Sequence, residues 1–214
     1  MTREIKKELI HILKMKKLFG MEHIPQLNFD LKENRINTLP SNIKDLETHV
    51  DNCSLCELSK IKESSYLGKG DVNSSIYLIG INYNFDLEKD FLMIKNMVEK
   101  VLNRNINDIY MTNIIKCNTS KIKADLKNEI STCISYIQRQ IDITNPKIII
   151  TLGDAFQHFI KNNDDMIDVS GNKFSYKEIL LLPLMDPSFI NKNPSYKEKM
   201  FKDLKKIKKI MDEK

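Results

Sequence analysis

The chain has 214 residues, of which 41% are hydrophobic and 29% charged, and it carries a formal net charge of +5. This length and balance predict one well-cored globular domain. No apolar run approaches the roughly 20 residues that span a bilayer, and the N-terminus lacks the apolar segment of an export signal. We therefore expect a cytoplasmic protein that does not contact a membrane.

The positive charge is concentrated at the two ends of the chain. Residues 1–20 hold six basic and two acidic side chains, and residues 195–214 hold eight lysines and four acids. Each end therefore carries +4, which leaves −3 for the middle. Two cationic ends suit a polyanionic partner, whereas the solvated faces of two Lys-rich helices would give the same composition.

The N-terminal part is predicted to be an amphipathic helix followed by an extended arm. Residues 3–18 carry apolar side chains at roughly helical spacing with lysines between them, and Gly20 follows. Residues 25–40 lose this pattern, and Asn, Asp and Lys dominate there. We therefore divide the chain into a helix and arm over 1–40 and a domain over 41–214.

The domain is predicted to begin with a short helix and to continue as alternating strands and helices. Ser41 is a suitable N-cap for a helix that runs to about Val50. The alternation that follows implies crossover connections and a parallel sheet covered on both faces. In such a sheet ligands bind outside the carboxyl ends of the strands, so the segments after the four strands should form one cleft. The predicted pairs are strand 75–80 with a helix that reaches Val101, strand 109–115 with helix 125–143, strand 147–152 with helix 154–162, and strand 179–184 with helix 195–212.

The second of these strands brings three polar side chains to the cleft. Residues 110–117 form a short apolar segment rich in β-branched side chains, and it carries Asn113, Lys116 and Cys117. A stiff strand holds side chains at its end in place, as a binding pocket requires. In isolation, Asn113 is more typical of a cap or turn. Lys116 is expected to be exposed, facing a polyanionic partner or a loop carbonyl.

Four cysteines are the candidate metal ligands. Cys53 and Cys56 form a C-x2-C turn, Cys117 follows a strand, and Cys133 lies on the next predicted helix. Structural zinc usually draws on two tight pairs, whereas four thiolates from a turn, a loop and a helix suit a 4Fe-4S cluster. Zinc and four buried free thiols are the alternatives. A cluster would tie the N-terminal segments to the sheet, which is a structural role.

Six segments carry a family resemblance: CSLCELSK, GKGD, SSIYLIG, IYMTNIIKC, NPKIIITLGDAF and DPSFINKNPSYKEKMFKDLKKI. In this order they resemble the family-four uracil-DNA glycosylases, the iron-sulfur branch of that superfamily, over roughly residues 45–210. The resemblance implies a three-layer α/β/α sandwich with a short central parallel sheet. It also implies DNA base-excision repair, in which a uracil is extruded from DNA into the cleft and its N-glycosidic bond is hydrolysed.

The resemblance also assigns roles to individual residues. Asn113 would read the flipped base, because its amide offers both a donor and an acceptor to a pyrimidine edge, and the four cysteines would hold the 4Fe-4S cluster. The terminal lysines would hold the phosphates of single- or double-stranded DNA, and the protein would be a nucleoid-associated monomer. The remaining implied contacts are the main chain of Gly80, Ile81, Asn82 and Tyr83 around the attacking water, and Asp186 and Ser188 beside the sugar.

Two departures from the family's pattern lie after the first strand. Ile81 stands where the family has an acidic or amide residue that helps to position the water. Asp86, Glu88 and Asp90 are candidate replacements, although acids before a helix are also typical first-turn charges. In the family a following loop carries a phenylalanine that stacks on the base, and this loop is shortened here. Phe91 is the candidate for that phenylalanine, with Tyr83 and Phe85 as the alternatives.

The third departure is Asp186, which precedes Pro187 where the family has a histidine. A carboxylate about 4 Å from the leaving uracil would repel its negative charge by roughly 1 to 4 kcal/mol, which slows cleavage by roughly 10- to 1000-fold. Asp186 is therefore protonated, or faces a cationic damaged base, or belongs to a site that no longer turns over. An N-cap or turn role is its ordinary alternative. The corresponding hypotheses are a glycosylase with an altered pocket and a DNA-binding or replication-associated module without catalysis.

Overall fold

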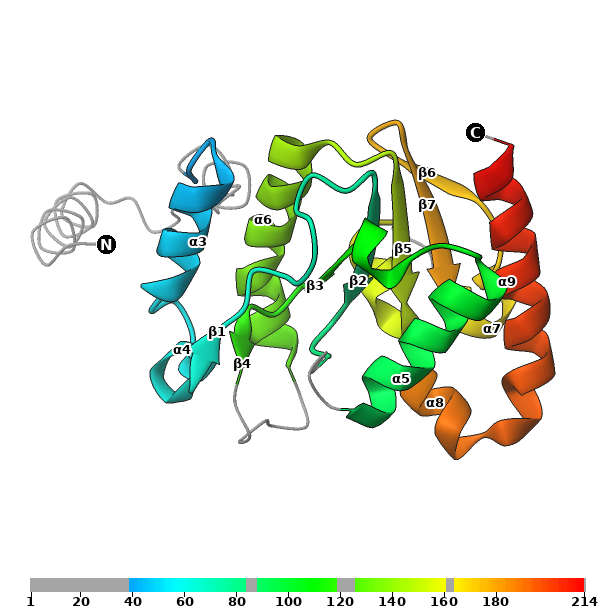
Figure 1. Ribbon diagram of the computed structural model, residues 1–214. Helices are drawn as coiled ribbons and strands as arrows, with labels where there is room; N and C mark the ends of the chain where they lie inside the picture. Colours follow the sequence, from blue (N-terminus) through cyan, green and yellow to red (C-terminus); the bar gives the residue numbers. More distant parts are fainter. Residues whose placement is uncertain (1–38, 84–87, 119–125, 161–163, 214) are drawn as a thin grey trace, which may run out of the picture. The chain divides into compact units, whose positions relative to one another are not determined.

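The computed structural model describes residues 39–83, 88–118, 126–160 and 164–213, and a five-stranded sheet lies at its centre (Figure 1). Four strands are parallel and entirely buried, as expected when helices cover both faces of a sheet. In sheet order the strands are β3 (Ile109–Asn113), β2 (Ile76–Gly80), β5 (Ile148–Leu152), β7 (Ile179–Leu184) and β6 (Phe174–Tyr176).

The edge strand β6 was not predicted, and it runs antiparallel to β7. The two strands are joined by Lys177 and Glu178, whose φ angles are +47° and +69°. Two consecutive positive φ angles are typical of the tight hairpin turn that fits the twist of a β-ribbon. Asn-Gly or Asp-Gly normally signals such a turn, and Lys-Glu does not. The hairpin was therefore missed, and the sheet is mixed at this one edge.

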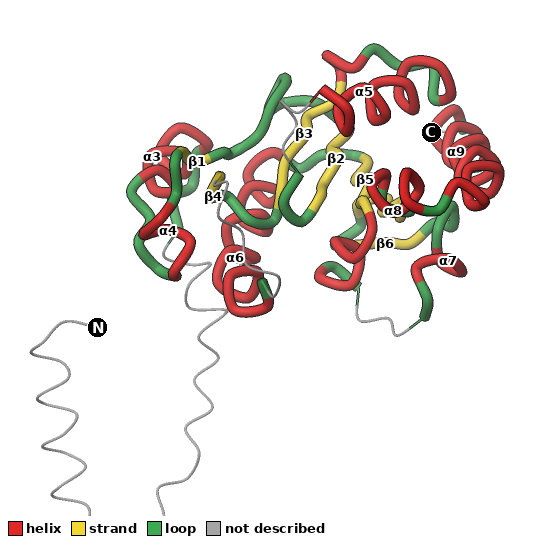
Figure 2. The backbone as a smooth tube through the Cα atoms, turned by 90° about the horizontal axis from the view of Figure 1, so that it is seen from below, coloured by secondary structure: helices red, strands yellow, loops and turns green. Residues whose placement is uncertain are grey.

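Helices cover both faces of the sheet and confirm the predicted three layers (Figure 2). Successive side chains of a strand point to opposite faces, so Ile150 packs in the core beneath α5 and α9, whereas Ile149 packs in the core beneath α6. The helices on the first face are α5 (Glu88–Asn96), its π-helical extension η1 (Met97–Val101), α8 (Pro187–Lys192) and α9 (Lys197–Asp212), and the long helix on the second is α6 (Lys127–Thr144).

Several predicted helices differ from the observed ones in their ends or type. The helix predicted over 154–162 is a 3-10 helix, η3 (Gly153–His158), which Gly153 opens at a φ of +54°. Asn42, and not Ser41, caps α3 (Ile43–Asp51). The helix predicted over 3–18 and most of the arm lie outside the described residues. No helix in the described part of the chain is both long and apolar enough to cross a membrane.

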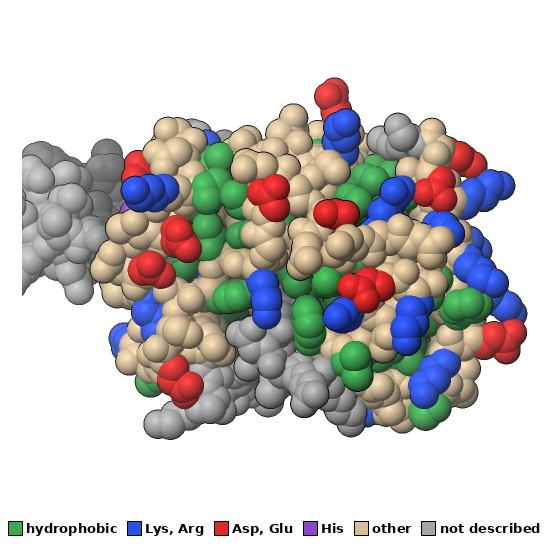
Figure 3. Space-filling model, viewed as in Figure 1, with side chains coloured by type: hydrophobic (Ala, Val, Ile, Leu, Met, Phe, Trp, Pro, Cys, Tyr) green, Lys and Arg blue, Asp and Glu red, His purple; other side chains and the backbone are tan. Residues whose placement is uncertain are grey.

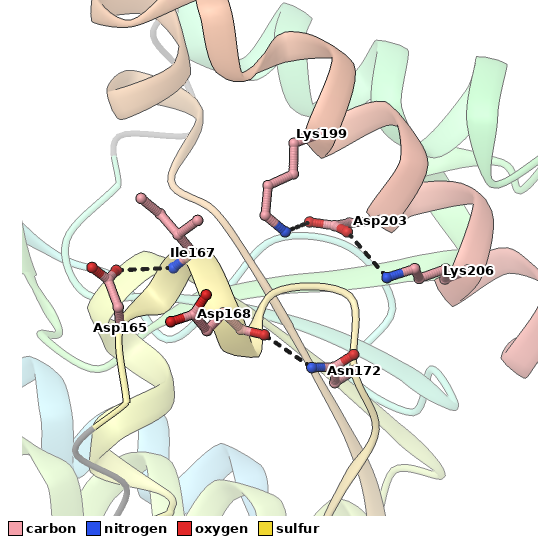
Figure 4. Close-up of polar contacts among 7 residues, drawn as sticks. All are labelled: Asp165, Ile167, Asp168, Asn172, Lys199, Asp203 and Lys206. Carbon is pink, nitrogen blue, oxygen red and sulfur yellow. Dashed lines mark hydrogen bonds and ion pairs between the residues drawn. The ribbon is translucent and has the colours of Figure 1, made fainter.

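Asp203 of α9 is paired with two lysines of the same helix (Figure 4), and it lies close to the turn that follows α7 (Met166–Val169). Its buried carboxylate lies between the ammonium groups of Lys199, at 2.9 Å, and Lys206, at 3.7 Å. A Cβ at Gly171, where φ is +79°, would lie 2.7 Å from the Asp203 Cβ. Glycine is therefore needed at this turn both for its backbone conformation and for the close approach of α9.

Candidate active site

The carboxyl ends of β2 and β3 form one rigid corner, as predicted. Gly80 is in register with Asn113. Hydrogen bonding continues beyond the strands, because the Ile114 N–H donates to the Gly80 carbonyl at 2.9 Å and the Ile115 N–H donates to the Ile81 carbonyl at 2.9 Å. The loop after β2 is therefore held against the end of β3. The last residue of β3 is Asn113, the predicted base reader.

The amide of Asn113 is buried and hydrogen-bonded twice to the main chain of Tyr83. Its Oδ1 accepts from the Tyr83 N–H at 3.0 Å, and its Nδ2 donates to the Tyr83 carbonyl at 2.7 Å. The Tyr83 ring lies against Gly80, where a Cβ would come within 2.2 Å of a ring carbon. Glycine at 80 therefore permits this packing. The sequence did not predict the bond between Asn113 and Tyr83, which fixes the orientation of the amide.

The other residues predicted beside the base or water surround this corner. Ile81 is half-buried against the core beneath α6. Its aliphatic side chain has no group that could take up or release a proton. Asn82 is half-buried, and Phe91 packs at the edge of the core beneath α5 and α9, with the Lys69 Nζ 5.1 Å from its ring centroid. The predictions for Phe85, Asp86 and the side chains of Glu88 and Asp90 fall outside the described residues.

The second corner is formed where β5 and β7 end, and it contains Asp186. The Asp186 Oδ1 accepts hydrogen bonds from the Ser188 N–H and the Ser188 hydroxyl, both at 2.6 Å, and from the Phe189 N–H at 3.2 Å. Asp186 is therefore the N-cap of α8. A Cβ at Gly153 would lie 3.0 Å from the Asp186 Cβ. The capping role that the sequence left as an alternative is thus the one observed.

The two corners flank the place where the order of the sheet reverses. From β2 the chain crosses to β3 on one side, and from β5 it crosses to β7 on the other side, while β2 and β5 are neighbours. Ligands of open α/β sheets bind in the crevice at such a switch point. Asn113, which ends β3, and Asp186, which follows β7, therefore belong to the two sides of this switch point between β2 and β5.

Lys116 is buried, which corrects the prediction that it is exposed. Its Nζ donates to the Thr112 hydroxyl at 2.7 Å, to the Gln140 Oε1 at 2.9 Å and to the Leu67 carbonyl at 3.2 Å. Burial lowers the pKa of Lys116 to about 7. The lysine does reach a loop carbonyl, but from the interior of the protein and not from its surface.

Three side chains converge on the carbonyl of Leu67, which precedes the GKGD segment. They are the hydroxyl of Thr112, the ammonium of Lys116 and the amide of Gln140. The same Gln140 amide donates to the Tyr110 hydroxyl at 2.9 Å. This buried network joins β3 and the residues after it to α6 and to the loop that contains Leu67. Buried polar groups of this kind are costly unless all of them are paired.

Gln140→Leu is expected to destabilise the protein by about 3 kcal/mol, because it leaves Lys116 and Tyr110 with unmatched polar groups in the interior. The midpoint of thermal unfolding should fall by roughly 6 to 12 °C. The matched control is Gln138→Leu, the same substitution at a half-buried position on the same helix. Equal shifts for the two variants in calorimetry would contradict a special role for the network.

The four cysteines lie near one another, although they come from different elements. Cys53 follows α3, Cys56 precedes α4 (Glu57–Ile61), Cys117 begins β4 (Cys117–Asn118) and Cys133 lies on α6. Burial, and after it the Cys56 and Cys53 thiols, raise the pKa of Cys117 to about 11. Burial and the other three thiols likewise raise the pKa of Cys133 to about 12, against the opposing Lys116 N–H. All four thiols are therefore within electrostatic range of one another.

This donor set fits an iron-sulfur cluster. Four cysteines are the ligands that such clusters require. In the described part of the chain, no three His, Cys, Asp or Glu side chains are close enough to hold a single ion. A cubane would instead take each thiolate on a different iron. The fold is therefore a three-layer α/β protein with a switch point between β2 and β5, and it carries four cysteines on α6, on β4 and beside α3 and α4.

Comparison with known proteins identifies the family. The sequence profile of the uracil DNA glycosylase superfamily matches residues 67–205, and the chain belongs to this superfamily. The type-4 uracil-DNA glycosylase of Sulfurisphaera tokodaii is 27% identical over 185 residues, which cover 78% of this chain and 84% of that protein. The type-4 enzyme of Saccharolobus solfataricus is 27% identical over 191 residues, or 81% and 88% of the two chains. A DNA polymerase of Bacillus phage SP01 is 25% identical over 105 residues, which cover 49% of this chain and 11% of the polymerase.

Proposed function

We propose that this protein is a DNA glycosylase of base-excision repair, which hydrolyses the N-glycosidic bond of a flipped uracil or a related damaged base. One observation carries the proposal: the amide of Asn113 is fixed at the carboxyl end of β3, beside the switch point of the sheet, in a chain of the uracil-DNA glycosylase superfamily. The type-4 uracil-DNA glycosylases that resemble it support the same activity.

The two corners suit the two parts of a flipped nucleotide. A base that enters the crevice meets an amide with both a donor and an acceptor, and the main chain of Gly80 to Tyr83 lines the wall beside it. Asp186 and Ser188 then lie on the side of the sugar. Flipping is required because the reacting bond cannot be reached within stacked DNA.

The test is a single-turnover assay with enzyme in excess over oligonucleotides that carry uracil, hypoxanthine or an alkylated base. The expected result is an abasic product from at least the uracil strand, and none from an unmodified strand. Absence of product from every substrate would contradict the proposed activity. Single- and double-stranded forms of each substrate would identify the DNA structure that the protein accepts.

A DNA-binding or replication-associated module without catalysis is the second candidate. It is favoured by the absence of a proton-handling side chain at Ile81 and by the use of Asp186 as a helix cap. The shorter similarity to a phage DNA polymerase agrees with a role beside replication. Tight binding to DNA without release of any base would select this alternative.

Among the lysines of α9, we propose that only those near the start of the helix contact DNA. Blue side chains gather over α9 in Figure 3, but the helix runs from the carboxyl edge of the sheet toward the opposite edge (Figure 1). At its far end Met211 lines a cavity of about 630 Å³ together with the first residues of β2 and β5. Lys192, which ends α8, and Lys197, which begins α9, are exposed, and we propose that they hold phosphates.

We also propose that Cys53, Cys56, Cys117 and Cys133 hold a 4Fe-4S cluster, with zinc as the alternative. The cluster would join α3, α4, β4 and α6, and it would contribute stability and not a step of base removal. Lys62 supports the same region, because its Nζ donates to the last carbonyls of α3 at Val50 and Asp51.

Cys117→Ser is expected to abolish the iron and acid-labile sulfide of anaerobically purified protein, together with its visible absorption, since a cubane needs all four thiolates. The unfolding temperature should fall as well, because metal-binding energy contributes to folding energy. Ser54→Ala, between the first two cysteines, is the control and should retain the cluster. Stoichiometric zinc without sulfide in the parent protein would contradict the cluster and support the alternative.

A further inference from the structure

The edge of Asn113 that would read a base is occupied in the free protein. A carboxamide has one edge on which its oxygen and an N–H lie side by side. In Asn113 the oxygen of this edge accepts from the Tyr83 N–H and the nitrogen donates to the Tyr83 carbonyl. The second N–H and the second lone pair point to other sides, so they cannot form a matching pair with a single base edge.

The group that occupies this edge has the hydrogen-bonding pattern of the proposed substrate. The main chain of Tyr83 presents an N–H beside a C=O. Uracil presents the same pair, its N3–H beside its O4 oxygen. Cytosine presents the reverse, a ring nitrogen that accepts beside an amino group that donates. The Tyr83 main chain therefore matches the edge of uracil and not that of cytosine.

Packing holds Tyr83 in this position. Its ring lies against the Gly80 main chain, where a Cβ would come within 2.2 Å of it, and it contacts the core beneath α5 and α9. Gly80 is itself in register with Asn113 on the neighbouring strand. The contact is therefore built from two strand ends and a packed aromatic ring.

We propose that the Tyr83 main chain is an internal stand-in for the base, which orients the Asn113 amide and which a flipped base must replace. This inference rests on the proposed base-reading role of Asn113. A base with an N–H beside a C=O replaces both hydrogen bonds one for one. A base with the reverse pattern replaces neither, and it leaves the Tyr83 bonds in place. Tyr83 is thus a positioning residue: it holds the amide in the orientation that suits uracil, and it competes with the base for that edge.

A matched pair of substitutions separates competition from simple support of the amide. Tyr83→Ala keeps the main-chain N–H, whereas Tyr83→Pro removes it, and both lack the ring. If Tyr83 competes with the base, the proline variant should bind a uracil oligonucleotide about fivefold more tightly than the alanine variant, the equivalent of one hydrogen bond. If Tyr83 only supports Asn113, the proline variant should bind more weakly. The probe carries a 2′-fluoro sugar, which disfavours cleavage during the measurement.

Hydrogen exchange of the Tyr83 amide in the unaltered protein gives a second measurement that needs no variant. The amide should be protected in the free protein and should lose protection when the 2′-fluorouridine strand is bound. The same strand with cytosine should leave it protected. Persistent protection with bound uracil, or weaker binding by the proline variant, would overturn the inference while leaving base excision intact. A failure of all forms to bind the uracil strand selectively would instead overturn the base-reading function, and the inference with it.

Discussion

Asn113→Ala is expected to lower the rate of uracil release in single turnover by roughly 100-fold. A bidentate contact to a base edge contributes about 1 to 3 kcal/mol, and the upper end applies because Asn113 is buried, so that its loss leaves the base edge without a partner away from water. A loss of about 3 kcal/mol in the transition state corresponds to roughly two powers of ten in rate. The measurement is the rate of formation of abasic product with enzyme in excess.

The control for this variant is Asn118→Ala, which removes an exposed amide from β4 on the same segment of chain. It should retain the parent rate. Loss of the Asn113 amide also leaves the Tyr83 main chain without its partners, so the unfolding temperature of both variants should be measured. A folded Asn113→Ala variant that releases uracil at the parent rate would contradict the assignment of the base reader.

The central strands could be predicted because their sequences and their environment agree. A run such as Ile148 to Ile150 is apolar and β-branched, which suits a parallel strand buried on both faces, and the structure places it at the centre of the sheet. The parallel order predicted that the ends of β2 and β3 meet at one edge of the sheet, and Gly80 is in register with Asn113 there. These predictions depend on local pattern and on the crossover connections of parallel strands, and both are readable from one sequence.

The remaining features depend on contacts between distant segments, which a local pattern does not contain. Lys116 was expected at the surface because lysine usually is exposed, but Leu67 and Gln140 supply acceptors for it in the interior. The partner of Asn113 is a main-chain group, so no side-chain motif indicates it. The one available signal of burial was the position of Lys116 in the apolar run 110–117, where its neighbours are buried.

Asp186 has two properties that the structure allows to be separated, its cap of α8 and its negative charge. The cap depends on an oxygen that accepts hydrogen bonds from Ser188 and Phe189, and asparagine is as good an N-cap as aspartate. The charge depends on the carboxylate alone. Asp186→Asn therefore removes the charge and keeps the helix start, whereas Asp186→His also restores the residue type that the related glycosylases have.

Asp186→Asn is expected to increase uracil release at least about 10-fold, because a like charge roughly 4 Å from the developing uracil anion costs about 1 to 4 kcal/mol. Asp186→His should release uracil faster still, since an imidazole can donate to the uracil oxygen, although loss of the cap should cost about 1 kcal/mol of stability. Asp165→Asn is the control, because Asp165 caps α7 in the same way (Figure 4). Slower release by the asparagine variant would mean that the carboxylate assists the reaction, as it would for a cationic base, and alkylated substrates would then show the larger loss.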